Sequence, residues 1–267
     1  MQSLSIIYED NHVIVVIKAP NDLSCPDDKT RDDAAAEGDN LLDQIRAYLA
    51  EQNGKKTAFV GLVHRLDRVT GGVMCFAKTS KAASRLSEQI RSGEFQKTYL
   101  AVTVGTPKLR EGTLVHHLLK NENKNVVEIV PFATTGAKRA ELSYTVSNKT
   151  PLTQSNLALL NVNLATGRSH QIRVQLASMG TPIWGDAKYG KSGRIAPYPK
   201  PAETESETSK TSFALALWAY DLVFVHPVSG DHLRFTVYPP ETAPWNLFDF
   251  DRRSHKTANS QSSGGHQ

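Results

Sequence analysis

A carboxylate lies between two arginines in the segment VHRLDRVTGGVMCFAK, residues 63–78. The acid is Asp67, and the bases are Arg65 and Arg68. Flanking guanidinium groups favour the charged form of a carboxylate, and a charged carboxylate can act as a nucleophile or as a base. The same three residues can also form an ordinary surface ion pair worth roughly 0–1 kcal/mol. Taken alone, these letters favour the surface ion pair.

Two adjacent glycines, Gly71 and Gly72, follow this carboxylate. Glycine permits backbone conformations and close approaches that other residues do not. A large substrate could use such an approach of the backbone. The simpler alternative is a tight hairpin with no role in binding.

A second group of polar side chains opens a predicted helix in TGRSHQIR, residues 166–173. Arg168, His170, Gln171 and Arg173 fall within six positions. A helix start offers free N–H groups and a positive potential, and arginine binds phosphate well. The alternative is a plain Ser or Thr cap with solvated arginines. A histidine such as His170 is, on its own, more typical of a structural hydrogen bond than of catalysis.

A third candidate is Tyr99 in QKTYLAV. An aromatic side chain on a strand belongs to the core by default, but a tyrosine near a carboxylate can stack on a nucleic-acid base. A metal site has weak support, because His116 and His117 are consecutive in a predicted strand and point to opposite faces. The sequence has neither G-x-G-x-x-G nor a Walker loop, so no motif supports a nucleotide cofactor.

The elements that must position these residues are mostly strands, with a few helices between them. Helices are predicted after a cap at Asn40, over 80–95 with a cap at Ser80 and an end at Gly93, and from the GRSH turn to Gly180. Strands are predicted on either side of the turn EDN, where the run 13–17 is the stronger half, and at 58–63, 72–78, 97–105, 113–119, 125–131, 138–148, 156–165, 213–227 and 231–237. This pattern predicts an α+β protein with a large, mostly antiparallel sheet.

Composition narrows the class of protein. The chain has 267 residues, a net charge of +4 and a pI of about 9.0, which is compatible with a polyanionic partner. Two cysteines, Cys25 and Cys75, form no C-x-x-C pair and indicate a reducing compartment. The N-terminus lacks the basic region of a signal peptide, and no apolar stretch approaches the roughly 20 residues that cross a bilayer. We expect a cytoplasmic protein that is a monomer and does not bind membranes.

Four segments occur in the order HRLDRVTGGVMCFAK, KTYLAVTVG, TGRSHQIRVQLASMGTPIWGDAKYG and LWAYDLVFVHPVSG. In this order the chain resembles the RluA-type family of RNA pseudouridine synthases, from IIYEDNHVIVVIKAP to FTVYPP. The resemblance implies the pseudouridine synthase fold, with a mixed, mostly antiparallel sheet, flanking helices and a central catalytic cleft. It also implies an isomerase that converts specific uridines of structured ribosomal or transfer RNA, with neither cofactor nor metal. We expect residues 1–250 to form the catalytic domain and 251–267 a disordered tail.

The resemblance also assigns roles to residues of the chain. Asp67 matches the essential aspartate, which acts as nucleophile or base towards the ribose. Tyr99 matches the tyrosine that stacks on the uracil, and Arg173 matches the basic residue that pairs with the aspartate. The substrate-binding residues that we expect are His64, Arg65, Arg168, His170, Gln171 and Leu217. Among these, Arg65 matches the arginine that enters the space left by the flipped base, and Leu217 a leucine of the pocket wall.

Some positions differ from the family pattern outside this matched set. Lys18-Ala19-Pro20 stands where N-K-P is usual, Gln175 where a histidine is common, and Trp218 where L-H-A is common. The resemblance begins close to Met1, so we expect no separate basic RNA-binding domain before the catalytic one. Two alternatives stay open: a non-catalytic RNA-binding or ribosome-assembly factor on the same scaffold, and a metal hydrolase using three side chains, His64, Asp67 and His170.

Overall fold

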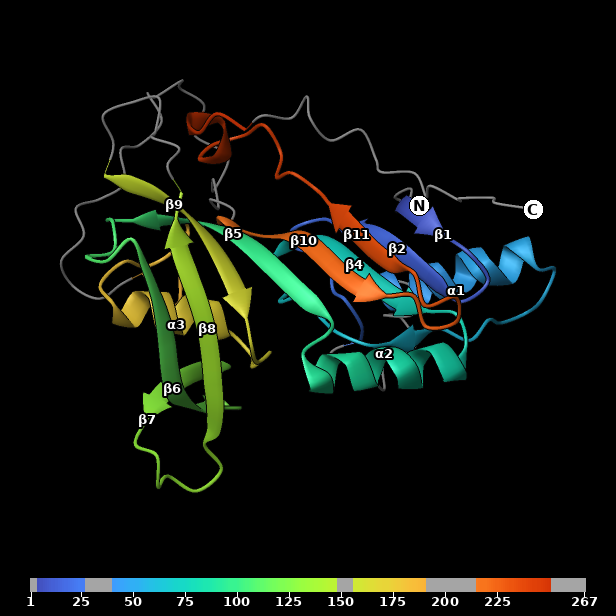
Figure 1. Ribbon diagram of the computed structural model, residues 1–267, viewed down its shortest axis with the longest axis horizontal. Helices are drawn as coiled ribbons and strands as arrows, with labels where there is room; N and C mark the ends of the chain where they lie inside the picture. Colours follow the sequence, from blue (N-terminus) through green and yellow to red (C-terminus); the bar gives the residue numbers. More distant parts are fainter. Residues whose placement is uncertain (1–3, 27–39, 148–155, 191–214, 251–267) are drawn as a thin grey trace, which may run out of the picture.

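The structure is a computed structural model that describes residues 4–26, 40–147, 156–190 and 215–250 (Figure 1). For the polar, acidic segment 27–40 and for the segment 191–212, which is rich in Pro, Ser and Glu, the sequence predicts loops. Both lie outside these ranges apart from Asn40, and so does the tail predicted at 251–267.

One sheet of eleven strands dominates the described part of the chain, in the order β1-β2-β4-β10-β5-β9-β8-β6-β7, with β11 paired to β10 and β3 to β4. The strands are β1 (Ser5–Glu9), β2 (Val13–Lys18), β3 (Gly61–Leu62), β4 (Gly71–Ala77), β5 (Gln96–Val104), β6 (Glu111–Asn121), β7 (Val126–Val130), β8 (Lys138–Val146), β9 (Leu157–Leu164), β10 (Leu217–Val225) and β11 (His232–Thr236). The helices are α1 (Leu41–Gln52), α2 (Ser80–Ser92), α3 (Gln171–Ser178) and a short 3-10 helix, η2 (Trp245–Leu247). All strand pairs except β4–β10 are antiparallel, which confirms the predicted α+β class.

Helices cover the N-terminal half of the sheet on both faces. In β2, Ile14 and Val16 pack in the same cluster as the buried side of α1, while Val13 and Val15 pack with Leu86 of α2. Successive side chains of a strand point to opposite faces, so a strand buried on both faces has a continuous apolar sequence. This is why VIVVI predicts its strand so well.

Local chemistry sets the helix ends. Asn40 caps α1 by accepting a backbone N–H of the first turn at 3.1 Å, as predicted. The cap predicted for α2 is one residue off, because Thr79 rather than Ser80 accepts the N–H of Ala82 at 3.2 Å. Gly93 ends α2 with a φ of 83°, a left-handed conformation that glycine adopts without a steric penalty.

The strand predicted at 58–63 is too long, because only Gly61–Leu62 pair with β4. Gly61 lies against α2 so closely that a Cβ atom there would come within 2.8 Å of the Cβ of Ala83. The chain before Gly61 lies outside the sheet, and Phe59 is left 53% exposed.

The two glycines that follow the Asp67 segment form the parallel contact at the centre of the sheet. Gly71 pairs with Trp218 and Gly72 with Ala219, both on β10. A Cβ atom on Gly72, whose φ is +125°, would lie 2.2 Å from the carbonyl oxygen of Ala219. The close approach that the two glycines permit is therefore made by β10. The sequence interpretation of Gly71 and Gly72 as a tight hairpin, or as a contact for a large substrate, is corrected to a contact between strands.

Strand β10 joins the two halves of the sheet (Figure 1). Along one edge it pairs first with β4, at Trp218 and Ala219, and then with β11 from Asp221 onwards. Its other edge pairs with β5, where the register shifts between Ala219 and Asp221. On the far half of the sheet, α3 packs beside β6 and β7.

Candidate active site

Asp67 lies on the segment between β3 and β4, and hydrogen bonds hold the backbone of its neighbours in the chain, Leu66 and Arg68. The Ser24 hydroxyl donates to the carbonyl of Leu66 at 2.9 Å and accepts the N–H of Leu66 at 3.1 Å. The buried amine of Lys18 donates to the carbonyl of Arg68 at 3.0 Å. The backbone on both sides of Asp67 is thus held, and the Asp67 side chain stays 26% exposed.

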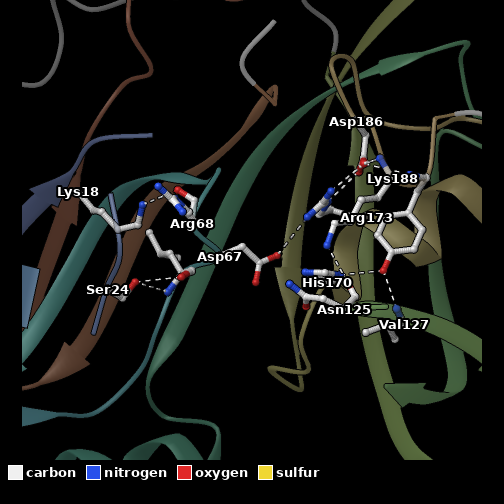
Figure 2. Close-up of polar contacts among 12 residues, drawn as sticks. Lys18, Ser24, Asp67, Arg68, Asn125, Val127, His170, Arg173, Asp186 and Lys188 are labelled. Carbon is white, nitrogen blue, oxygen red and sulfur yellow. Dashed lines mark hydrogen bonds and ion pairs between the residues drawn. The ribbon is translucent and has the colours of Figure 1, made fainter. Parts of the chain in front are cut away.

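Lys18 is completely buried although it carries an amine. Burial lowers the pKa of Lys18 to about 8, against the opposing effect of the nearby carboxylates Asp22 and Asp67. This is the position at which the chain differs from the N-K-P pattern, and its side chain supports the segment that carries Asp67 (Figure 2).

The charged partner of Asp67 comes from across the cleft. An Arg173 nitrogen, Nη1, lies 3.9 Å from Oδ2 of Asp67, and this is the ion pair that Asp67 makes within the described residues. The arginines beside Asp67 in the sequence do not fill that role: Arg68 donates from Nε to the carbonyl of Asn21 at 3.1 Å, and Arg65 is exposed. Arg173 thus faces Asp67 across the cleft, whereas the Arg68 side chain is engaged with Asn21 (Figure 2).

Arg173 is held by a residue that the sequence reasoning missed, Asp186. Nε and Nη2 of Arg173 donate to the two carboxylate oxygens of Asp186 at 2.8 Å each, and both side chains are buried. Burial acts to raise the pKa of Asp186, but the hydrogen bonds and charge of Arg173 outweigh it and hold this pKa below its usual value. A two-point bond of this kind fixes the plane of the guanidinium group, which leaves Nη1 directed towards Asp67.

A cavity of about 430 Å³ opens in front of Asp67. One wall is the segment between β3 and β4, and α3 with its preceding turn forms the opposite wall. Tyr99 and Lys97 line the cavity from β5, on which alternate residues share a face, and Leu217 lines it from the start of β10. Burial, with a further contribution from the charge of Asp67, raises the pKa of Tyr99, so its phenol stays protonated.

His64 lines the cavity, but one of its ring nitrogens is already used within the protein. Nε2 accepts the backbone N–H of Cys75 at 3.1 Å, and the ring packs against Phe95 with a centroid distance of 5.4 Å. Burial lowers the pKa of His64 to about 3, and the charge of Lys97 acts in the same direction, so the imidazole is neutral. These contacts give His64 a structural role, and its expected contact with substrate stays a prediction.

The turn before α3 is stabilised by Gln171. Its amide oxygen accepts the hydroxyl of Thr166 at 2.8 Å and the N–H of Arg168 at 3.0 Å, and its amide nitrogen donates to the carbonyl of Glu141 at 3.0 Å. Both Arg168 and Gln171 line the cavity, yet the Gln171 amide is engaged with its own chain. The residue at the cap position of α3 is His170, and its side chain makes no cap hydrogen bond.

Three further residues belong to the site without having been predicted: Asp186, Lys97 and Tyr189. Lys97 faces the cavity, and burial lowers its pKa. The Tyr189 ring lies under the guanidinium group of Arg173, 5.2 Å from ring centroid to Cζ. Asp186 and Tyr189 both fall within the segment WGDAKYG, one of the quoted motifs, so its polar residues were the available signal.

The described residues contain no cluster of three or more His, Cys, Asp or Glu side chains suited to a metal ion. The set proposed for a metal hydrolase, His64, Asp67 and His170, is not such a cluster, and Nε2 of His64 is occupied by Cys75. Nor does any helix in these residues combine the length and the apolar character needed to cross a membrane.

Comparison with known proteins places this arrangement in a family. The sequence profile of the family described as RNA pseudouridylate synthase matches residues 12–178. The ribosomal large subunit pseudouridine synthase D of Zymomonas mobilis is 32% identical over 243 residues, covering 89% of this chain and 70% of that protein. The ribosomal large subunit pseudouridine synthase C of Haemophilus influenzae is 32% identical over 196 residues, which cover 73% of this chain and 55% of that protein.

Solved structures support the same fold. The human protein RNA pseudouridylate synthase domain containing 4 superposes with a TM-score of 0.66 at 23% identity, over 88% of each chain. The human protein RNA pseudouridylate synthase domain containing 1 gives a TM-score of 0.64 at 20% identity, over 92% of this chain and 88% of that one. Because the family profile matches residues 12–178 and the two bacterial relatives are 32% identical to this chain, it belongs to the RluA-type family of RNA pseudouridine synthases.

Proposed function

We propose that Asp67 is the catalytic aspartate of this RNA pseudouridine synthase. The observation that carries the proposal is the ion pair of 3.9 Å between Asp67 and an arginine that is itself fixed by a buried carboxylate. A charged group held in place before reaction needs no reorganisation when the reaction occurs, and in a site screened from water its effect is strong. Arg173 can therefore hold the Asp67 carboxylate in its reactive position.

The reaction requires only groups that the cavity offers. The bond between N1 of uracil and C1′ of ribose breaks, the base turns, and C5 forms a new bond to C1′. The C5 hydrogen leaves as a proton, and N1 takes up a proton. Asp67 acts on the ribose, either as a nucleophile at C1′ or as a base. Tyr99 stacks on the uracil, and Leu217 packs at its edge, because both side chains line the cavity beside Asp67.

The target uridine has to leave its stack before it can enter such a cavity, which costs a few kcal/mol. Arg65 is exposed at the mouth of the cavity, where it can occupy the space that the base vacates. Arg168, exposed on the opposite wall, is placed to bind phosphate. His64, His170 and Gln171 complete the proposed substrate-binding set.

We propose ribosomal RNA as the substrate, because the relatives from Zymomonas mobilis and Haemophilus influenzae are named for the large ribosomal subunit. Transfer RNA is the competing substrate. We further propose that residues 1–250 act as a monomeric catalytic domain in the cytoplasm, which light scattering and cell fractionation can check.

The test is a map of pseudouridine in total RNA at single-base resolution. Cells lacking the protein are compared with cells given wild type, Asp67→Asn or Asp231→Asn. Asp231 is exposed in the turn between β10 and β11, away from the cavity, so it controls for the loss of a carboxylate. Wild type and Asp231→Asn should restore the same uridines, and Asp67→Asn none.

Other outcomes are equally informative. A mark restored by Asp67→Asn would refute the role of Asp67, and a missing mark in transfer RNA would refute the ribosomal assignment. RNA binding without any change in the map would favour the non-catalytic RNA-binding factor.

A further inference from the structure

His170 has a backbone conformation that histidine seldom adopts. Its φ and ψ are 50° and 18°, in the left-handed region, although it is not a glycine. It precedes α3 directly and does not cap it with its side chain. The side chain is turned instead to Tyr189, with Nδ1 2.8 Å from the Tyr189 hydroxyl. A strained residue of this kind at a cleft can indicate a functional constraint.

The hydrogen bonds around Tyr189 assign the proton on His170. The Tyr189 hydroxyl oxygen accepts the backbone N–H of Val127 at 2.8 Å. We assign the proton of this hydroxyl to Nδ1 of His170, which lies 2.8 Å away and is the acceptor within reach in the described part of the chain. Burial lowers the pKa of His170, although Asp67 opposes this effect, so the ring is neutral. In a neutral ring whose Nδ1 accepts, Nε2 carries the proton.

The Nε2–H group has no hydrogen-bond partner among the described residues, and His170 lines the cavity. Figure 2 shows His170 and Arg173 on the same side of the cleft, facing Asp67. Beside the cations Arg173 and Lys97, the cavity thus offers His170 as a neutral donor whose direction is fixed by its contact with Tyr189. A neutral N–H donor suits a carbonyl oxygen, and uracil has two, O2 and O4.

We propose that His170 donates its Nε2–H to a carbonyl oxygen of the target uracil, and that Tyr189 is the positioning residue that fixes this donor. The proposal rests on the proposed function of the cleft. When the bond between N1 and C1′ breaks, its electron pair stays on the uracil and is shared by N1, O2 and O4. A preorganised donor at one of these oxygens stabilises the departing base more than the bound uridine.

Two substitutions of His170 distinguish a role of its Nε2–H as a hydrogen-bond donor from a role of its backbone conformation. In His170→Gln the amide N–H reaches the place of Nε2, whereas in His170→Asn it reaches only the place of Nδ1. Asparagine tolerates the left-handed conformation better than glutamine. A purely conformational role therefore favours the Asn variant, and a donor role favours the Gln variant.

The assay is a single turnover on an unmodified transcript of large-subunit ribosomal RNA with tritium at C5 of uracil, because C5 loses its hydrogen when it bonds to C1′. We expect His170→Gln to release tritium within a few-fold of the wild-type rate. His170→Asn should be slower by about 100-fold, as for the loss of one donor in an oxyanion hole. The Kd for the transcript should change by less than about threefold, since the donor acts mainly during bond cleavage.

Tyr189→Phe tests the positioning role, because it removes the hydroxyl and keeps the ring under Arg173. Its single-turnover rate should fall between those of the two His170 variants, with an unchanged Kd and a melting temperature that shows a folded protein. Equal rates for the Gln and Asn variants, or a faster Asn variant, overturn the donor role. A wild-type rate in Tyr189→Phe overturns the positioning role. No tritium release by wild type would instead count against the proposed function.

Discussion

Replacing Asp186 by asparagine tests the buried arginine pair on which the proposed site depends. The change keeps the size of the side chain and removes its charge. Arg173 and Asp186 have side chains that are 6% and 0% exposed, and they share two hydrogen bonds of 2.8 Å. Asparagine can accept only one of these two bonds, and it leaves the buried guanidinium charge with Asp67, 3.9 Å away, as its remaining ion-pair partner.

The expected loss is large because the pair is buried. Removing one partner of a buried ion pair typically costs about 3–5 kcal/mol, far more than the roughly 0–1 kcal/mol of a surface pair. The loss also depends on pH. The folded-state pKa of Asp186 is lowered, so its contribution is fully present above the unfolded pKa of about 3.9 and is lost as the pH falls through the lower folded value.

Urea unfolding followed by circular dichroism measures this loss. At neutral pH, Asp186→Asn should be about 3–5 kcal/mol less stable than wild type, while the control Asp231→Asn stays within about 0.5 kcal/mol. The difference between Asp186→Asn and wild type should shrink in acid. Tritium release should fall as well, since Arg173 is no longer fixed. A loss at neutral pH as small as that of the control would refute the description of this pair.

Three other predictions concern the strands and the cavity. Burial lowers the pKa of Lys18 to about 8, so the contribution of its neutral amine to stability is fully present above about pH 10.4 and is lost as the pH falls through about 8. As the pH rises between these two values, the free energy of unfolding of wild type should increase relative to that of Lys18→Met by up to about 1.4 kcal/mol per pH unit, which urea unfolding measures. Gly72→Ala should cost about 3 kcal/mol in thermal unfolding, because its Cβ would lie 2.2 Å from a backbone oxygen of β10. Gly54→Ala, with a φ of +59° and nothing within 4 Å, should cost only about 1–2 kcal/mol. Lys97→Met should lower the salt dependence of RNA binding by about one unit of slope if its amine binds a phosphate, which titrations at several salt concentrations measure.

Much of the fold could be predicted because the signals for it are local. The apolar run 13–17, the cap at Asn40 and the glycine at 93 each act within a few residues, and all three have their expected roles. The strand predicted at 58–63 is too long because its length depends on pairing with β4, a tertiary contact that covers only Gly61 and Leu62 and that no local pattern reports.

Local sequence patterns predicted less of the site, because its contacts join segments that are far apart in the sequence. Adjacency in the sequence suggested Arg65 and Arg68 as partners of Asp67, but the cation that faces this carboxylate is Arg173. Arg173 in turn depends on Asp186, which follows α3 in a turn without any periodic pattern. Only the folded chain brings these three segments together.

The central place of β10 also has a consequence during synthesis. This strand, from Leu217 to Val225, lies between β4 and β5, which are made much earlier and do not pair with each other. Until β10 leaves the ribosome, a nascent chain presents two unpaired strand edges, the kind of surface that invites aggregation. Contacts between residues so far apart in the sequence form slowly. The nascent chain therefore carries Asp67 and Tyr99 long before β10 can join β4 to β5, and we expect truncated products that end before β10 to be both inactive and prone to aggregate.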